Sequence, residues 1–120
     1  MDCIFCKIIN GDIPSFALYE DEIVKVFLDI DPKANGHTLI IPKKHYKDIE
    51  DIDDETLMHI FKIAKKMKTL LEDKLQIEGL TFVQNNGLSQ EVKHYHLHLI
   101  PNYKANDLIS VEEVYKKINA

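Results

Sequence analysis

Hydrophobic residues along this chain change their spacing several times, and each spacing predicts a different kind of element. Short runs rich in strand-forming residues occupy positions 16–20, 23–29, 37–41, 80–84 and 94–100. Between the third and fourth runs, apolar residues recur every three or four positions over 53–75, which predicts one long amphipathic helix. The predicted apolar face of this helix consists of Leu57, Ile60, Phe61, Ala64, Met67, Leu71 and Leu75.

Short helices are predicted at both ends of the chain. Residues 3–9 precede an Asn-Gly pair, which is typical of a helix end. Ser110 and Glu113 have capping-box spacing and predict a last short helix. Short links between strands favour antiparallel pairing, and the long helix can cover one sheet face. We therefore expect a single α+β domain over residues 1–120, with two layers and an antiparallel sheet of about five strands.

Composition and charge restrict the possible partners. The chain has 120 residues, of which 45% are hydrophobic, and its formal net charge is -5. That charge does not suit binding to a nucleic-acid backbone, which usually needs a basic surface. No apolar run approaches the ~20 residues of a membrane span, and the first residues lack the basic start of a signal peptide. We expect a cytoplasmic protein with no nucleic-acid or membrane partner.

Three histidines at alternate positions, His94, His96 and His98, carry the strongest chemical signal. In a strand they share one face, while Tyr95, Leu97 and Leu99 can pack beneath the long helix on the other. Crowded imidazoles lower one another's pKa, so at least one should be neutral near pH 7. A neutral imidazole is a nucleophile, and its neighbours can donate hydrogen bonds to phosphate. The pattern favours phosphoryl or nucleotidyl transfer over a solvated strand face or a purely metal-binding role.

A Cys-x-x-Cys pair, Cys3 and Cys6, begins the chain. A structural disulfide is not expected in a reducing compartment. The pair is compatible with a redox site, half of a zinc site, or two buried thiols. Tetrahedral zinc would need two further ligands from elsewhere in the chain.

The His-x-His-x-His pattern followed by two apolar residues resembles the signature of the histidine triad (HIT) family. The resemblance covers nearly the whole chain through CIFCKII at 3–9, DIP at 12–14, FLDI at 27–30 and GHTLIIPKKH at 36–45. It implies an antiparallel sheet with two main helices, usually in a homodimer. It also implies a hydrolase or phosphoramidase that cleaves purine nucleotide conjugates at the α-phosphate. A nucleotide sensor with little turnover and a zinc-stabilised interaction protein remain as alternatives.

The resemblance assigns a role to each matching position. His96 matches the nucleophile, His98 the residue that contacts the phosphate and leaving group, and His37 a histidine that supports the triad. Asp29 matches the carboxylate that accepts hydrogen bonds from the ribose. The purine pocket and the phosphate loop match Ile4, Phe5, Ile8, Ile13 and Phe27, and Asn85 and Gln90, respectively. The plainer interpretation of the five apolar residues is ordinary core.

Bacterial members of the family imply a structural zinc. On that resemblance its ligands here are Cys3, Cys6, His45 and His94. Such a metal would tie the N-terminal helix to the histidine strand and keep His94 neutral. Buried free thiols are the alternative.

The loop before the triad departs from the family pattern. It is about two residues shorter than in many members and lacks a glycine directly before Gln90. Glu91 stands where a hydroxyl is common, and its carboxylate repels phosphate unless it points away or is paired. Lys93 could pair with it if residues 91–93 are extended. We therefore expect weaker phosphate contacts from this loop.

Overall fold

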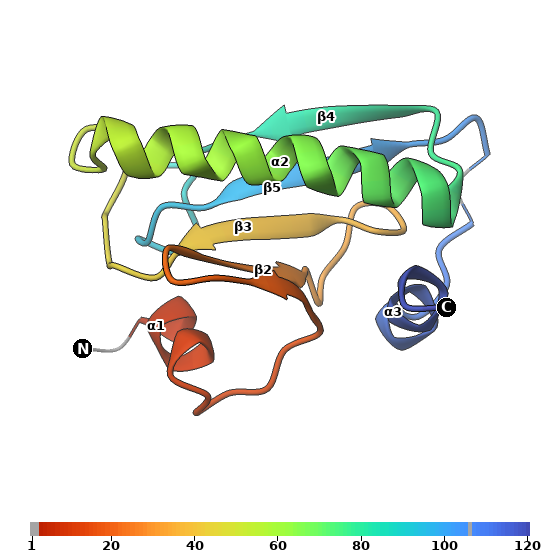
Figure 1. Ribbon diagram of the computed structural model, residues 1–120, viewed down its shortest axis with the longest axis horizontal. Coiled ribbons are helices and arrows are strands. Elements are labelled where there is room, and N and C mark those ends of the chain that lie inside the picture. Colours follow the sequence, from red (N-terminus) through yellow and green to blue (C-terminus); the bar gives the residue numbers. More distant parts are fainter. Residues whose placement is uncertain (1–2, 106) are drawn as a thin grey trace.

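Five strands form one antiparallel sheet in the computed structural model, which describes residues 3–105 and 107–120. They are β1 (Ala17–Glu20), β2 (Val24–Leu28), β3 (Thr38–Pro42), β4 (Gly79–Val83) and β5 (Leu97–Asn102). The strand order is β1-β2-β3-β5-β4, so the last strand of the sequence enters between β3 and β4 (Figure 1). The histidine-bearing β5 is therefore an interior strand with a partner on each side.

Within the described residues, three helices complete the predicted α+β fold: α1 (Ile4–Ile9), α2 (Asp54–Leu75) and α3 (Val111–Ile118). Each begins after a residue whose side chain accepts a hydrogen bond from a backbone N–H three residues on, namely Cys3, Asp53 and Ser110. The long helix α2 covers one face of the sheet and runs along its strands, while α1 and α3 lie at opposite ends (Figure 1). Among the described residues, no helix combines the length and apolar character that a membrane crossing requires.

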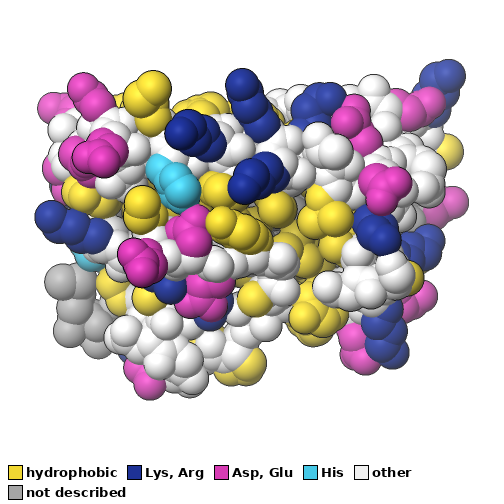
Figure 2. All heavy atoms as spheres, viewed as in Figure 1, with side chains coloured by type: hydrophobic (Ala, Val, Ile, Leu, Met, Phe, Trp, Pro, Cys, Tyr) yellow, Lys and Arg dark blue, Asp and Glu magenta, His cyan; other side chains and the backbone are white. Residues whose placement is uncertain are grey.

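The core lies between α2 and one face of the sheet. Tyr95, Leu97 and Leu99 pack there as predicted, against buried α2 residues that include Ile60, Ala64 and Met67. Lysine side chains gather along the outer side of α2 (Figure 2).

One predicted member of the α2 core face is wrong. Phe61 is 40% exposed, and its ring lies 6.0 Å from that of Phe82 on β4. Ile63 is buried instead, since it is three positions after Ile60 and four before Met67 on the same helical stripe.

The opposite sheet face is covered at one end by α1. Phe5 and Ile8 of α1 pack there against Phe27, Leu39 and Ile41. Because side chains alternate along a strand, this face also receives His96 and His98, whose neighbours Leu97 and Leu99 face α2. The sheet thus separates the main core from the candidate site.

The fifth strand differs from its predicted boundaries at both ends. It begins at Leu97 rather than residue 94, and it continues through Pro101 to Asn102. The Glu78 N–H donates to the Asn102 carbonyl, so the backbone polar groups of Asn102 point toward β4 and those of Pro101 point to the opposite side. On that side the pairing with β3 extends only to Leu99, which lies opposite Thr38. The missing N–H of Pro101 therefore costs no sheet hydrogen bond.

Candidate functional site

The register of four strands places one histidine between an apolar and a polar region. Leu39 lies opposite Phe27 on β2 and opposite His98 on β5, and His98 lies opposite Val83 on β4. These four side chains form a row across one sheet face because directly paired residues point to the same side. His98 therefore stands between the pocket under α1 and the loop after β4.

Two cavities meet at this row. The first, which we call the apolar cavity, has a volume of about 260 Å³ and is lined mainly by Ile4, Phe5, Ile8, Ile13, Phe27 and Leu39. The second, the polar cavity, has a volume of about 290 Å³, and its lining includes Lys33, His37, Asn85 and Ser89. Asp29, Asp31, Glu91, His96 and His98 line both. The two histidines thus stand where an apolar ring and a polar group of one ligand could meet.

Asp29 and His37 extend the pairing of β2 with β3 by one residue. The Asp29 N–H donates to the His37 carbonyl at 2.9 Å, which brings the Asp29 Oδ2 to 3.5 Å from the His37 Nε2. The preceding Gly36 has φ +89°, and a Cβ there would come within 2.6 Å of Leu75 on α2. Only glycine fits this turn without displacement, so the close packing of α2 helps to place His37.

Backbone contacts fix which ring nitrogens carry protons. The Lys33 N–H donates to the His37 Nδ1 at 3.1 Å, so a neutral His37 carries its proton on Nε2. That Nε2 lies 2.9 Å from the His98 Nδ1 and donates to it. A neutral His98 then carries its own proton on Nε2, as a donor toward a ligand.

His96 has the opposite tautomer. Its Nδ1 lies 2.7 Å from the carbonyl oxygen of His94 and donates to it. The Nε2 of a neutral His96 is consequently unprotonated and carries a lone pair. The ring is 4% exposed, packs edge-on against Phe5 at 5.0 Å, and lines both cavities. This is the arrangement that a nucleophilic imidazole requires.

The surroundings keep these imidazoles neutral. Burial, reinforced by the neighbouring His96 and His37, lowers the pKa of His98 to about 4. Burial also lowers the pKa of His96 and of His37, although the Asp29 carboxylate partly opposes this at both rings. The predicted direction is confirmed, but its main cause is loss of water rather than repulsion between imidazoles.

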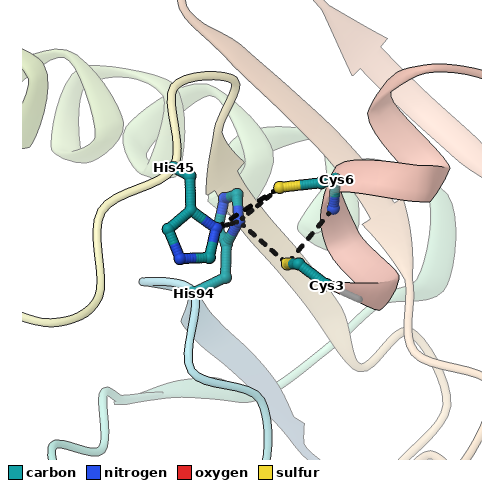
Figure 3. A group of neighbouring side chains, drawn as sticks. All are labelled: Cys3, Cys6, His45 and His94. Atoms are coloured by element: carbon teal, nitrogen blue, oxygen red, sulfur yellow. Dashed lines mark hydrogen bonds between the residues drawn. The ribbon is translucent and has the colours of Figure 1, made fainter. Parts of the chain in front are cut away.

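His94 does not line either cavity; it belongs to a second cluster. Cys3, Cys6, His45 and His94 converge from the start of α1, the loop after β3 and the segment before β5 (Figure 3). Their ligand atoms all lie within 4.8 Å of one another. The family resemblance implied these four residues as ligands, and the structure brings them together.

The separations in this cluster match those of tetrahedral zinc. Cys3 Sγ and Cys6 Sγ lie 3.4 and 3.6 Å from the His94 Nδ1, Cys6 Sγ lies 3.3 Å from the His45 Nδ1, and the two Nδ1 atoms are 3.1 Å apart. A tetrahedral zinc ion with ordinary bond lengths places its sulfur and nitrogen ligands ~3.6 Å apart and two nitrogens ~3.3 Å apart. Both cysteines are free thiols. The donor set and its geometry therefore fit this metal.

A backbone carbonyl also prepares His94 as a ligand. Its Nε2 lies 2.8 Å from the Pro42 carbonyl and donates to it, which leaves the lone pair on Nδ1, the atom that faces the thiols. Burial lowers the pKa of His94 to about 4, so the ring is neutral near pH 7. Hydrogen bonds from the ring nitrogen that does not bind the metal orient histidine ligands in metal sites.

In the loop before the triad, Gln90 and Lys93 make contacts that the sequence did not predict. Gln90 is buried, and its amide donates to the Lys47 carbonyl at 2.6 Å rather than lining a cavity. Residues 91–93 form bends and are not extended, so Lys93 does not share a strand face with Glu91. Lys93 binds the carbonyls of Gly87 and Gln90 instead. In the described parts of the chain, Glu91 takes part in no ion pair.

Comparisons with known proteins show which family this chain is similar to. Residues 10–105 match the family described as HIT domain. A HIT-like protein of Methanocaldococcus jannaschii is 49% identical over 106 residues, which cover 87% of this chain and 81% of that protein. The adenosine 5'-monophosphoramidase HNT1 of Saccharomyces cerevisiae is 48% identical over 101 residues, which cover 82% of this chain and 61% of that protein.

Solved structures give the same result. A zinc-bound histidine triad family protein of Mycobacterium smegmatis has a TM-score of 0.91 and 32% identity, over 98% of this chain and 91% of that one. A Hit-like protein of Bartonella henselae has a TM-score of 0.89 and 40% identity, over 98% and 94% of the two chains. The chain therefore belongs to the HIT family, as the resemblance of its motifs implied.

Proposed function

We propose that this chain is a nucleotide hydrolase that cleaves purine nucleotide conjugates, phosphoramidates among them, at the α-phosphate. One observation carries the proposal: the His96 Nδ1 donates to the His94 carbonyl at 2.7 Å, which leaves the Nε2 lone pair for a ligand in the adjoining cavities. The yeast relative named as an adenosine 5'-monophosphoramidase supports the same class of reaction.

The reaction proceeds in two displacements. The lone pair of the His96 Nε2 attacks the α-phosphorus, and the bond from phosphorus to the leaving nitrogen breaks, with its electrons and a proton from solvent going to the departing amine. The Nε2–H of His98 donates to the phosphate oxygens as charge develops. Water then attacks the nucleotidyl-histidine, its hydroxyl joins phosphorus, its second proton returns to solvent, and His96 regains its lone pair.

The nucleotide spans both cavities. The purine occupies the apolar cavity, where Ile4, Phe5, Ile8, Ile13 and Phe27 surround it. The carboxylate of Asp29, at the junction, accepts hydrogen bonds from the ribose hydroxyls. Asn85 and His98 contact the phosphate in the polar cavity, and His37 holds His98 through the 2.9 Å hydrogen bond. Gln90 acts on this site through the loop it holds rather than by direct contact.

Zinc has a structural role in this proposal. Cys3, Cys6, His45 and His94 would hold it, and four protein ligands leave no open position for a substrate. A metal there ties α1, and with it one wall of the apolar cavity, to the segment that carries the nucleophile. Since thiol ligands must stay reduced, the site suits a cytoplasmic protein.

A homodimer completes the proposal. β4 is an edge strand of the sheet, with unpaired backbone groups along its outer side. Three exposed hydrophobic side chains lie on β4 and the outer side of α2, namely Phe82, Phe61 and Met58. An apolar patch beside an open strand edge supports self-association at this surface.

The decisive experiment compares wild type with His96→Ala on an adenosine phosphoramidate. Loss of the nucleophile should lower kcat by at least ~10³-fold while the far-UV circular dichroism spectrum stays unchanged. His59→Ala is the matched control, because His59 lies on α2 and lines neither cavity. Acid-quenched wild type should carry a nucleotidyl adduct on His96. If His96→Ala keeps a tenth of the activity, the covalent route is wrong; if wild type binds AMP without turnover, the chain is a sensor.

A further inference from the structure

The turn that follows β4 is held by a lysine to which the proposed function gives no role. We propose that Lys93 is a positioning residue, whose ammonium holds residues 87–90 so that amides of this loop face the nucleotide phosphate. The inference rests on the proposed function, because it concerns the same phosphate site.

The Lys93 side chain forms hydrogen bonds with both ends of a tight turn. Its Nζ donates to the Gly87 carbonyl at 2.5 Å and to the Gln90 carbonyl at 2.8 Å. The Gln90 N–H also donates to the Gly87 carbonyl, at 3.0 Å, which closes a four-residue turn. Gly87 has φ +82°, a conformation that favours glycine. Ser89, inside the turn, lines the polar cavity, while Lys93 lines neither cavity.

The same two contacts orient two backbone donors. The peptide units whose carbonyls bind Lys93 also contain the N–H groups of Leu88 and Glu91. In a trans peptide the C=O and N–H point in opposite directions, so both N–H groups point away from the ammonium. Within residues 3–105 and 107–120, neither donates to another group of the chain. Unpaired backbone N–H groups on a turn are suitable donors to phosphate oxygens.

A buried amide fixes the other side of the turn. Gln90 is 2% exposed; its Oε1 accepts from the Gly87 N–H at 3.3 Å, and its Nε2 donates to the Lys47 carbonyl at 2.6 Å. Gln90 thus anchors the turn to the loop after β3, and Lys93 binds it from the solvent side. Together they hold the loop in one conformation. Because this short loop has few amides, its contacts with a phosphate depend on the placement of each one.

The test uses two ligands that differ only in the phosphate. Titration calorimetry of Lys93→Met should show AMP binding weakened about fivefold, a modest loss because the lysine is exposed. Adenosine should bind as it does to wild type. Lys93→Arg should restore AMP binding, since the guanidinium keeps the charge and several donors. Lys104→Met, at a lysine whose side chain is 91% exposed and outside both cavities, should leave both ligands unaffected.

High salt separates positioning from a distant charge effect. At 1 M salt the Debye length is ~3 Å, so a long-range attraction between Lys93 and phosphate is screened while direct hydrogen bonds persist. The Lys93→Met defect should therefore survive at 1 M salt. The inference is overturned if the defect disappears there, if adenosine and AMP weaken equally, or if the variant binds AMP like wild type. A wild type that prefers adenosine to AMP would instead overturn the phosphate site itself.

Discussion

The two histidine clusters use the same side chain in opposite ways, although two of their members are separated by a single residue. In the cluster of Cys3, Cys6, His45 and His94, which we call the metal cluster for its donor set, His94 gives its Nε2–H to the Pro42 carbonyl and presents Nδ1 to two thiols. In the cluster of His37, His96 and His98, which we call the cavity cluster, His96 gives its Nδ1–H to the His94 carbonyl and presents Nε2 to the cavities. A backbone carbonyl selects the tautomer in each case, and the tautomer selects the role.

The clusters also differ in what their histidines face. His94 is buried behind Phe5 and lines neither cavity, whereas His96 and His98 line both. Four protein ligands can saturate a zinc ion, whereas side chains that line a cavity can reach a ligand. The comparison therefore predicts that damage to each cluster has a different readout.

The largest expected effect is that a substitution in each cluster changes a different property of the protein. His45→Ala should lose bound zinc, from one per chain to none, and lower the melting temperature by ~10 °C, because metal binding is coupled to folding. His98→Ala should keep one zinc per chain and lower kcat by ~10²-fold, because it removes a donor to the phosphate. Metal analysis, thermal unfolding and turnover on the same preparations measure this.

Two outcomes would break the distinction. Wild type that holds no metal after zinc supplementation, with both thiols reactive, would make Cys3 and Cys6 plain free thiols. A His98→Ala chain that loses its metal would show that the clusters are not independent.

Asp29 gives an intermediate effect that sharpens the picture of the cavity cluster. Asp29→Ala should weaken AMP binding about tenfold, because hydrogen bonds to a charged acceptor are worth ~1.5–3 kcal/mol before compensation. The loss should nearly vanish with 2′,3′-dideoxy-AMP, which lacks the hydroxyls. Equal losses on both ligands would assign Asp29 to holding His37, whose Nε2 lies 3.5 Å from its carboxylate.

The smallest effect concerns Glu91, which lines both cavities without an ion pair in the described chain. Glu91→Ser should raise kcat/KM about threefold at low salt by removing repulsion with the phosphate. The gain should shrink at 1 M salt, where exposed charges are screened. A fall in kcat/KM at every salt concentration would instead make the carboxylate a working part of the site.

Local patterns predicted most of the fold. The 3.6-residue spacing located α2 almost to the residue, and alternation placed Leu97 and Leu99 under it although the regular strand begins only at Leu97. The four metal-cluster residues were named through a family resemblance, because their separation along the chain gives no sign of contact. Cys6 and His45 are 39 residues apart, yet their ligand atoms lie 3.3 Å from each other.

Contacts set by sheet order escaped prediction. Nothing in the local sequence places β5 between β3 and β4, and this arrangement brings Gln90 to the Lys47 carbonyl. No local pattern pairs His59 with Asp21, yet the His59 Nε2 lies 2.7 Å from this carboxylate in the turn between β1 and β2. Burial raises the pKa of Asp21, but hydrogen bonds from His59, two backbone amides and Tyr19 outweigh it and lower that pKa overall. Such pairs depend on tertiary packing, which a local pattern does not contain.

The short helix α1 joins the two clusters in a thermodynamic sense. It begins directly after Cys3, contains Cys6, and supplies Ile4, Phe5 and Ile8 to the apolar cavity. Six residues are too few for an independently stable helix. The position of α1 therefore depends on what binds to its cysteines and on what fills the apolar cavity. Ligand binding at the two sites is then reciprocal: if a metal on the thiols raises purine affinity by some factor, the purine raises metal affinity by the same factor. Through α1, the fraction of chains that hold a metal would then set the apparent affinity for nucleotide.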